Sequence, residues 1–193
     1  MVRPREFDEQ QALSAAMQVF WEKGYEATSI SDLTTRMGIQ RPSLYAAFGG
    51  KKELFETVLH KYTQISLTYI ENLLSRAPSA REAVRIYLQG IIEGGGGRQT
   101  NLGCLCINTM VELAPHDQSF AHLTKDYQLR ITELLRQTIE DGIRKGELAS
   151  GLNAVAIARA LTVSAVGLAV TMKSAPEHAY VENAVTELLT LLV

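Results

Sequence analysis

Apolar residues recur at helical spacing along most of the chain. In the N-terminal part Ile30, Leu33 and Met37 fall at positions i, i+3 and i+7, which places them on one face of a helix. The same kind of spacing runs through residues 118–145 and 177–192. No stretch alternates apolar and polar residues as a strand does, and no internal repeat is present. The pattern predicts an all-α protein of about nine helices.

Residues 28–55 contain the clearest helix boundaries. Ser29 is a good N-cap, and Asp32 three residues later completes the sequence pattern of a capping box. Gly38 stands where a helix ends in a left-handed residue, and Pro42 is tolerated in the first turn of the next helix. Two short helices joined by such a tight turn predict a helix-turn-helix, whose second helix enters the major groove of DNA.

Longer helical segments account for the rest of the chain. A first helix is expected from Asp8 to Gly24, supporting the helix-turn-helix, and a fourth is expected from Lys51 to about Arg76. Further helices are expected over residues 79–94, 102–113, 118–145, 154–173 and 177–192. The domain boundary then falls in the fourth helix, between a head of residues 1–50 and a larger helical body of residues 51–193.

A run of glycines, Gly94 to Gly97, interrupts the body. Glycine loses the most backbone freedom on ordering, so the run predicts a mobile surface loop. A phosphate-cradling loop is the alternative, but the lysine, the Ser or Thr and the preceding strand of such a loop are missing.

The head resembles the N-terminal domain of the TetR family of transcriptional repressors. The resemblance covers about the first quarter of the chain and rests on Lys23 to Ser29, Asp32-Leu33, Met37 to Ile39, Pro42 to Tyr45, Phe48 and Lys51 to Phe55. It implies a repressor that binds a palindromic double-stranded DNA operator as a symmetric homodimer. It also implies that a small-molecule effector bound in the body releases the operator, but it does not identify that effector.

The candidate DNA contacts are polar side chains on the outer face of the second helix of the helix-turn-helix, together with Thr28 before its first helix and Lys51 at the start of the fourth helix. Arginine pairs bidentately with guanine and glutamine with adenine, whereas hydroxyl groups and lysine more often hold phosphates. The predicted DNA-binding set is Thr28, Gln40, Arg41, Ser43, Tyr45 and Lys51. Arg3 and Arg5 are further candidates, as an N-terminal arm that reaches the minor groove or a phosphate, although they also fit an ordinary charged tail.

Two other sets of residues are assigned to the body. Aromatic, polar and sulfur-containing side chains near an expected central cavity suit a small organic ligand, or else form plain core: Tyr62, Tyr69, Tyr87, Cys104, Asn108, Met110, Tyr127 and Met172. One apolar side of the last helix is the predicted dimer interface, together with the helix before it: Val181, Val185, Leu188, Leu189 and Leu192.

Cys104 and Cys106 are the only cysteines, and they allow two interpretations. Thiol or metal sensing is one. On a regular helix, however, residues two apart point about 200° apart, so the pair would neither form a disulfide nor share a metal ion. Buried cysteine commonly packs as a small apolar residue, which is the interpretation favoured here. No recognisable catalytic or metal-binding spacing occurs elsewhere, so we expect neither enzymatic activity nor a cofactor.

Composition changes this picture little. The chain is 46% hydrophobic with a net charge of -2, which describes a globular protein and does not by itself reveal a DNA-binding surface. Its most apolar stretch, 154–172, is broken by Arg159, and we expect it to be too short to cross a membrane. A cytoplasmic location follows from these features. The alternative from another class is a helical ligand-binding or enzymatic protein whose DNA-reading head is vestigial.

Overall fold

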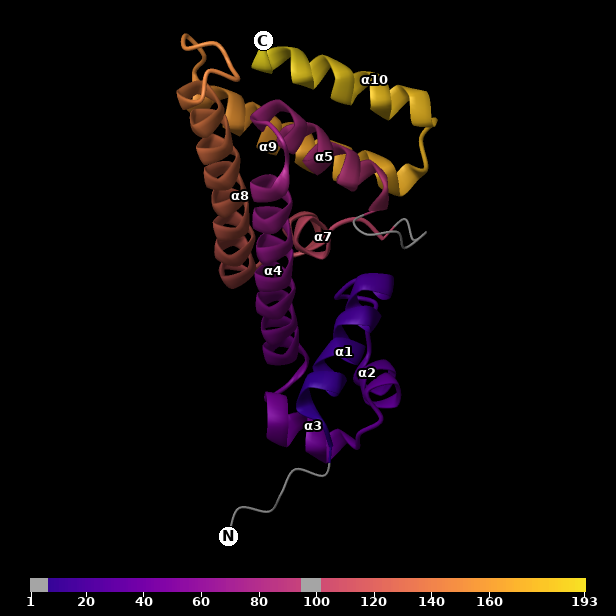
Figure 1. Ribbon diagram of the computed structural model, residues 1–193. Coiled ribbons are helices and arrows are strands. Elements are labelled where there is room, and N and C mark those ends of the chain that lie inside the picture. Colours follow the sequence, from indigo (N-terminus) through magenta and orange to yellow (C-terminus); the bar gives the residue numbers. More distant parts are fainter. Residues whose placement is uncertain (1–6, 95–101) are drawn as a thin grey trace.

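The computed structural model describes residues 7–94 and 102–193, and within these ranges it contains nine α-helices and no strand. The all-α prediction is confirmed. A small head lies at one end of the molecule, and a long helix joins it to a larger body (Figure 1). The α-helices are α1 (Glu9–Lys23), α2 (Ile30–Met37), α3 (Arg41–Phe48), α4 (Lys51–Arg76), α5 (Ala80–Ile92), α7 (Leu105–Glu112), α8 (Gln118–Arg144), α9 (Ala154–Thr171) and α10 (His178–Leu188), and two 3-10 turns follow the last two, η1 (Met172–Ser174) and η2 (Leu189–Leu192).

The head is a three-helix unit around α1. Asp8 caps this helix by accepting hydrogen bonds from the N–H groups of Gln10 and Gln11. The buried face of α1 packs against apolar side chains of α2, α3 and the start of α4, among them Leu33, Leu44 and Phe55, all of which are fully buried. Burial of each such side chain stabilises the fold by roughly 1.5–3 kcal/mol. This packing holds α2 and α3 in place, because neither of these two helices is long enough to be stable alone.

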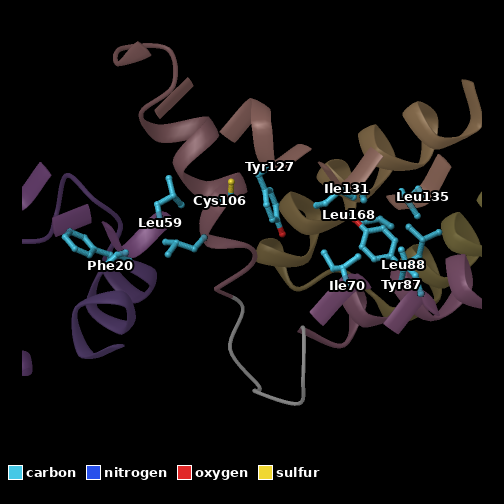
Figure 2. Packing of buried hydrophobic residues seen from close by; sticks show 14 of the residues in the cluster. Phe20, Leu59, Ile70, Tyr87, Leu88, Cys106, Tyr127, Ile131, Leu135 and Leu168 are labelled. Atoms are coloured by element: carbon cyan, nitrogen blue, oxygen red, sulfur yellow. The ribbon is translucent and has the colours of Figure 1, made fainter. Parts of the chain in front are cut away.

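The helix α4 belongs to both parts of the molecule. Near its middle, Lys61 Nζ donates to Gln10 Oε1 (2.9 Å) and Ser14 Oγ (3.2 Å) of α1. The buried apolar cluster runs without a break from Phe20 in the head, past Leu59 on α4, to Tyr127 in the body (Figure 2). The head is therefore packed against the first half of α4.

The body packs α8 against α4, α5 and α9. Gly142 lies in α8 where a Cβ atom would come within 2.4 Å of the Ala80 Cβ and 3.0 Å of Leu148. Although glycine is unfavourable inside a helix, α8 continues through Gly142 to Arg144. Its lack of a side chain lets α8 and the start of α5 approach closely.

The last helix requires a correction of the predicted dimer interface. Val181, Val185, Leu189 and Leu192 are buried inside this single chain, where α10 and η2 pack against α5, and Leu188 is half-buried. The periodicity located the apolar face correctly, but that face covers the chain's own core. The apolar side chains that remain at the surface of this part of the chain are others: Val155, Val163 and Val170 on α9, and Tyr180, Leu191 and Val193.

The segment Ala154–Ser174, formed by α9 and η1, is long and apolar enough to cross a membrane by length and composition alone. This contradicts our expectation that Arg159 divides it into pieces that are too short. In the fold, one side of α9 packs on α8. Leu161 and Ala165 are buried on that side, while Val163 on the other side remains 73% exposed.

Candidate DNA interface and ligand cavity

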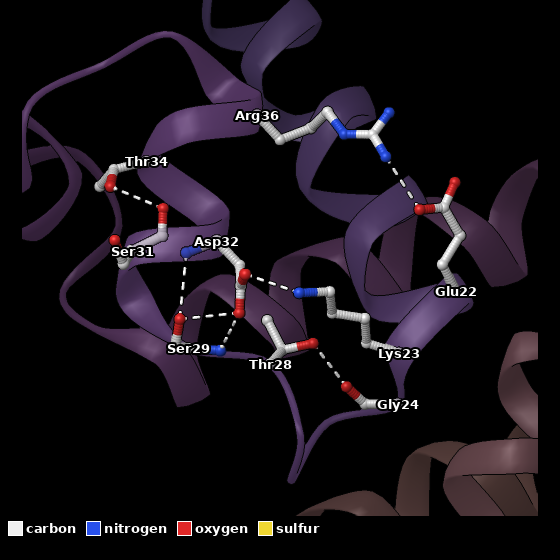
Figure 3. A network of polar contacts seen from close by, with 9 residues as sticks. All are labelled: Glu22, Lys23, Gly24, Thr28, Ser29, Ser31, Asp32, Thr34 and Arg36. Carbon is white, nitrogen blue, oxygen red and sulfur yellow. Dashed lines mark hydrogen bonds and ion pairs between the residues drawn. The ribbon is translucent and has the colours of Figure 1, made fainter.

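Local hydrogen bonds fix both ends of α2, and Figure 3 shows those at its start. Ser29 Oγ accepts from the Asp32 N–H (3.1 Å), and the Asp32 carboxylate accepts from the Ser29 N–H (2.9 Å), so the predicted capping box is confirmed. Gly38 adopts the left-handed conformation (φ 68°, ψ 30°), and the Ile39 N–H donates to Thr34 O (3.1 Å). These bonds set the direction in which the chain enters α3.

Two ion pairs attach α2 to α1. Lys23 Nζ lies 2.6 Å from Asp32 Oδ1, and an Arg36 nitrogen lies 2.8 Å from Glu22 Oε2 (Figure 3). The hydrogen bond from Lys23, followed by those from Ser29, holds the pKa of the Asp32 carboxyl well below its usual range. Both pairs are exposed and add little stability, but they fix the angle between the two helices.

The outer surface of α3 presents the predicted readers of DNA. Leu44 and Phe48 are buried, which turns the opposite side of the short helix outward. Gln40, Arg41 and Tyr45 are exposed and Ser43 is half-buried, and within 7–94 and 102–193 none of these four side chains makes a hydrogen bond or ion pair. Their donors and acceptors are free to meet base edges and phosphates.

The two remaining members of the predicted set are placed differently. Thr28 is 1% exposed and its hydroxyl donates to Gly24 O (2.6 Å), so it stabilises the loop before α2 and presents no surface to DNA. Lys51 is half-buried at the first turn of α4, with its ammonium 4.3 Å from the centre of the Tyr25 ring. The neighbouring Lys52 is committed to the body through Asp117 (2.5 Å). Arg3 and Arg5 lie outside the described residues, as do three of the four consecutive glycines, 95–97.

The body contains a cavity of about 550 Å³. That volume is ordinary for a small-molecule site. Six of the eight predicted effector-binding residues line it: Tyr62, Tyr69, Tyr87, Cys104, Tyr127 and Met172. Thus the structure brings together side chains from α4, α5, α8 and the residues flanking α7 and α9.

The other two predicted residues face elsewhere. The Asn108 amide donates to Leu102 O (2.8 Å) and accepts from Lys173 Nζ (2.9 Å), and the Met110 sulfur accepts a hydrogen bond from Gln128. Both lie on α7, whose Ile107 is the residue that turns to the cavity. Asn108 and Met110 thus stabilise α7 through hydrogen bonds on sides of the helix that do not face the cavity.

Sequence reasoning missed two of the most informative wall residues. Trp21 comes from α1 in the head, and its indole N–H donates to Gly103 O (2.9 Å) while its ring meets Tyr62 edge-on at 5.3 Å. Gly90 lies in α5, and a Cβ built on it would have nothing within 4 Å. A glycine inside a predicted helix was a possible signal, because glycine costs roughly 1 kcal/mol there relative to alanine.

Hydroxyl groups contribute to the polarity of the wall. Tyr62 donates to Cys104 Sγ (3.3 Å), and the Tyr127 hydroxyl lies 2.7 Å from Ser66 Oγ. Burial raises the pKa of Tyr62 and of Tyr127 well above the ordinary value, so both phenols are neutral at physiological pH. They act as hydrogen-bond groups without charge.

The two cysteines have different surroundings. Cys106 is buried in α7, and its burial raises the pKa of its thiol. Cys104 is the N-cap residue of α7 and faces the cavity, so the pair does not share a regular helix as the sequence suggested. In the described part of the chain, no three His, Cys, Asp or Glu side chains are grouped to hold a metal ion.

The helix α7 contacts both the cavity and the head. At its end, Glu112 accepts from the N–H groups of Tyr25 (3.1 Å) and Glu26 (2.8 Å), in the loop between α1 and α2. At the other end, Gly103 and Cys104 form the cavity wall and bind Trp21 and Tyr62. Any displacement of this wall therefore acts on the head directly.

In this chain, helix α1 of the helix-turn-helix head forms part of the wall of a ligand-sized cavity, and the wall helix α7 binds the head. This arrangement defines a class of protein, the DNA-binding regulators that carry their own sensing domain. The chain belongs to the tetR family of bacterial regulatory proteins. Residues 12–58 match the sequence profile of that family, and residues 75–188 match that of the tetracyclin repressor-like C-terminal domain. The resemblance of the head to this family is thereby confirmed and extends to the body.

Similar proteins agree with this assignment. The HTH-type transcriptional repressor ComR of Escherichia coli K12 is 31% identical over 172 residues, which cover 89% of this chain and 82% of that protein. The repressor BdcR of the same organism is 32% identical over 125 residues, covering 65% of this chain and 62% of BdcR. Among solved structures, a cysteine mutant of the TetR family regulator CifR in complex with 26-bp operator DNA is 32% identical, with a TM-score of 0.86 and coverage of 97% and 98%.

Proposed function

We propose that this regulator is a repressor that binds a palindromic double-stranded operator as a homodimer and releases it when a small molecule occupies the cavity. The observation that carries the proposal is the joint placement of Trp21 and Glu112: the head forms part of the cavity wall, and the wall helix α7 binds the head. A ligand that binds more tightly to one position of α7 shifts the equilibrium between the corresponding positions of the head, and its difference in affinity sets the size of that shift.

DNA binding is proposed for the outer face of α3 and the start of α4. Arg41 and Gln40 are the proposed base readers, and Ser43, Tyr45 and Lys51 the proposed phosphate contacts. The relatives named as repressors and the CifR complex with operator DNA support this assignment. Thr28 is left out because its hydroxyl is buried.

Dimerisation is proposed for the outer face of α9 and α10. Val163 and Val170 are exposed on α9, and Tyr180 and Leu191 are exposed beyond it. A groove of about 380 Å³ runs between the two helices, with Gly167 and Ala184 in its wall. Such a contiguous apolar face suits a second copy of the chain, because two heads that read a palindrome require a two-fold axis.

Val163→Asp tests this interface. The side chain is 73% exposed, so the change should leave the monomer folded while placing a charge in the apolar contact. Sedimentation should show a monomer that binds the operator poorly. The matched control is Val111→Asp on α7, where the valine is 63% exposed and lies away from this face. A Val163→Asp protein that sediments as the wild type would place the interface elsewhere.

Selection of bound sequences from random duplexes tests the whole proposal. A two-fold symmetric consensus is expected, with affinity that falls steeply as salt rises. Enrichment of no sequence, with retention that depends on salt alone, would refute sequence-specific repression. We propose no catalytic activity, since the family is one of regulators, and a cytoplasmic location, where the operator is found.

A further inference from the structure

The chemistry of the cavity wall points to the kind of effector, an inference that rests on the proposed ligand response. Among the described residues of the wall, Glu93 is the only formally charged side chain, and it lies at the exposed end of α5. No described lysine, arginine or histidine lines the cavity. An anion would lose its hydration there without gaining a partner of opposite charge from the described wall.

Aromatic rings form part of the cavity surface. Trp21, Tyr62, Tyr69, Tyr87 and Tyr127 all contribute, and Trp21 meets Tyr62 edge-on. The remaining wall is mainly isoleucine, leucine, alanine and methionine. Flat or flexible apolar ligands gain contact area and favourable ring geometry in such a site.

The hydrogen bond between Tyr62 and Cys104 supplies a point of specificity. The neutral phenol donates to a thiol sulfur (3.3 Å), which is a weak acceptor. An uncharged oxygen of a ligand, such as a carbonyl or ether oxygen, accepts the same proton more strongly. Ser66 and Tyr127 already satisfy each other (2.7 Å), and no buried polar side-chain atom in the described residues lacks a partner. The Tyr62 hydroxyl, whose acceptor is this weak one, is therefore an exchangeable donor.

Gly90 determines how much space is present. It is a helical residue without a positive φ, and nothing lies within 4 Å of an added Cβ. Neither close helix packing nor backbone conformation requires glycine here, unlike at Gly142, where Ala80 would clash. What the missing side chain leaves is free volume on the cavity wall that Gly90 shares with Tyr62 and Tyr87.

We infer that the effector is an uncharged, largely apolar molecule whose acceptor oxygen replaces Cys104 as the partner of the Tyr62 hydroxyl, and that Gly90 sets the size it can have. The effector fills the space next to Gly90, and its polar atom faces α4. Bulkier residues at position 90 exclude it and leave a repressor that cannot respond.

Four small phenyl compounds test the charge and the acceptor. Benzylacetone is a neutral ketone, 3-phenylpropanoate is its anionic counterpart of equal size, 3-phenylpropylammonium is a cation, and butylbenzene has no acceptor. The single tryptophan of the chain, Trp21, reports binding by its fluorescence, which these compounds do not obscure. We expect the ketone to bind at least tenfold more tightly than either ion. The described wall offers no charged partner to the anion, and Glu93, the one charge it offers the cation, lies at the exposed end of α5.

Variants test the two residues. Tyr62→Phe should weaken the ketone roughly 3- to 10-fold, the effect of one neutral hydrogen bond, and leave butylbenzene unchanged. Gly90→Leu should abolish binding of all four compounds, whereas Gly90→Ala should retain most of it and keep the helix intact. Operator binding by the free proteins should be unaffected in every variant, so loss of DNA binding would count against the proposed function instead.

Four results would overturn the inference. One is an anion that binds as tightly as the ketone, and the second is the failure of all four compounds to bind. The third is equal weakening of the ketone and butylbenzene by Tyr62→Phe. The fourth is a folded Gly90→Leu protein with wild-type affinity, which would show that the space beside this residue is not used.

Discussion

Glu112 offers the sharpest test of how the body controls the head. Its carboxylate stands at the last residue of α7, where the helix dipole disfavours a negative charge, and it accepts two hydrogen bonds from backbone N–H groups of the head at 3.1 and 2.8 Å. Glu112→Gln keeps the shape but leaves one acceptor oxygen and no charge. One of the N–H groups of Tyr25 and Glu26 then loses its partner.

The expected loss can be estimated from these contacts. A hydrogen bond to a charged group contributes about 1.5–3 kcal/mol and a neutral one about 0.5–1.5 kcal/mol, so the change should cost about 1–2 kcal/mol. The Glu26 amide is exposed, and water replaces part of its lost bond. For a chain of this length, such a loss lowers the melting temperature by roughly 2–8 °C. The same loss raises the equilibrium constant for opening of the loop between α1 and α2 approximately 5- to 30-fold.

Hydrogen exchange measures this opening at the residues concerned. The amides of Tyr25 and Glu26 should exchange faster in Glu112→Gln than in the wild type, and more ligand should be needed to release the operator in fluorescence anisotropy. Glu147→Gln is the matched control, because Glu147 also accepts from a backbone N–H, that of Ala80 (2.8 Å), but within the body. It should lower stability without changing exchange at 25 and 26. Unchanged exchange there in Glu112→Gln would refute the proposed link.

Three further changes test other parts of the molecule. Arg41→Ala should relax base preference at one position of each half-site by about 1–3 kcal/mol, whereas Lys51→Ala should weaken all sequences alike and reduce the salt slope by about one; gel shifts over a salt series distinguish them. The hydrogen bond from Lys52 is the main cause that lowers the pKa of Asp117 to about 2, so its stabilising effect is complete above the ordinary value of about 3.9 and is lost as the pH falls towards 2. In Asp117→Asn, stability should therefore depend less on pH between about 2 and 3.9, as measured by acid unfolding followed by circular dichroism. An unchanged pH dependence would show that the Lys52–Asp117 pair contributes nothing to stability. Cys106→Ser should leave the response of operator binding to peroxide or zinc as in the wild type, since burial keeps this thiol protonated; loss of that response would make Cys106 a sensor.

Much of the head was predictable because the interactions that determine its helix boundaries are between residues close in sequence. Ser29 with Asp32, Gly38 and the apolar spacing of α2 act within a few residues of one another, and the structure forms the bonds that they specify. The burial of Thr28 was not predictable in this way. Its hydroxyl bonds to Gly24 in a loop whose shape depends on Glu112, far away in the sequence.

The body shows where periodicity alone is insufficient. The spacing of Val181 and Val185 identifies an apolar face on α10, but not whether α5 or a second chain covers it. Likewise, aromatic residues suggested a cavity, yet the contribution of Trp21 depends on how α1 lies against α4 and α7, and that of Gly90 on a space that no neighbour fills. Both are properties of packing between distant segments.

The length of α4 has a geometric consequence. Its 26 residues, at 1.5 Å each, make a rod of roughly 39 Å with the cavity beside its distal part and the DNA-reading surface at its tip. Because Lys61 fastens α1 to this rod, a tilt of about 5° at the body end carries the head sideways by roughly 3 Å. In a two-fold dimer, opposite tilts change the separation of the heads by up to about 7 Å, a fifth of the ~34 Å between successive major grooves. Shifts near the pivot that are too small to break a helical hydrogen bond are thus enlarged several-fold where the bases are read.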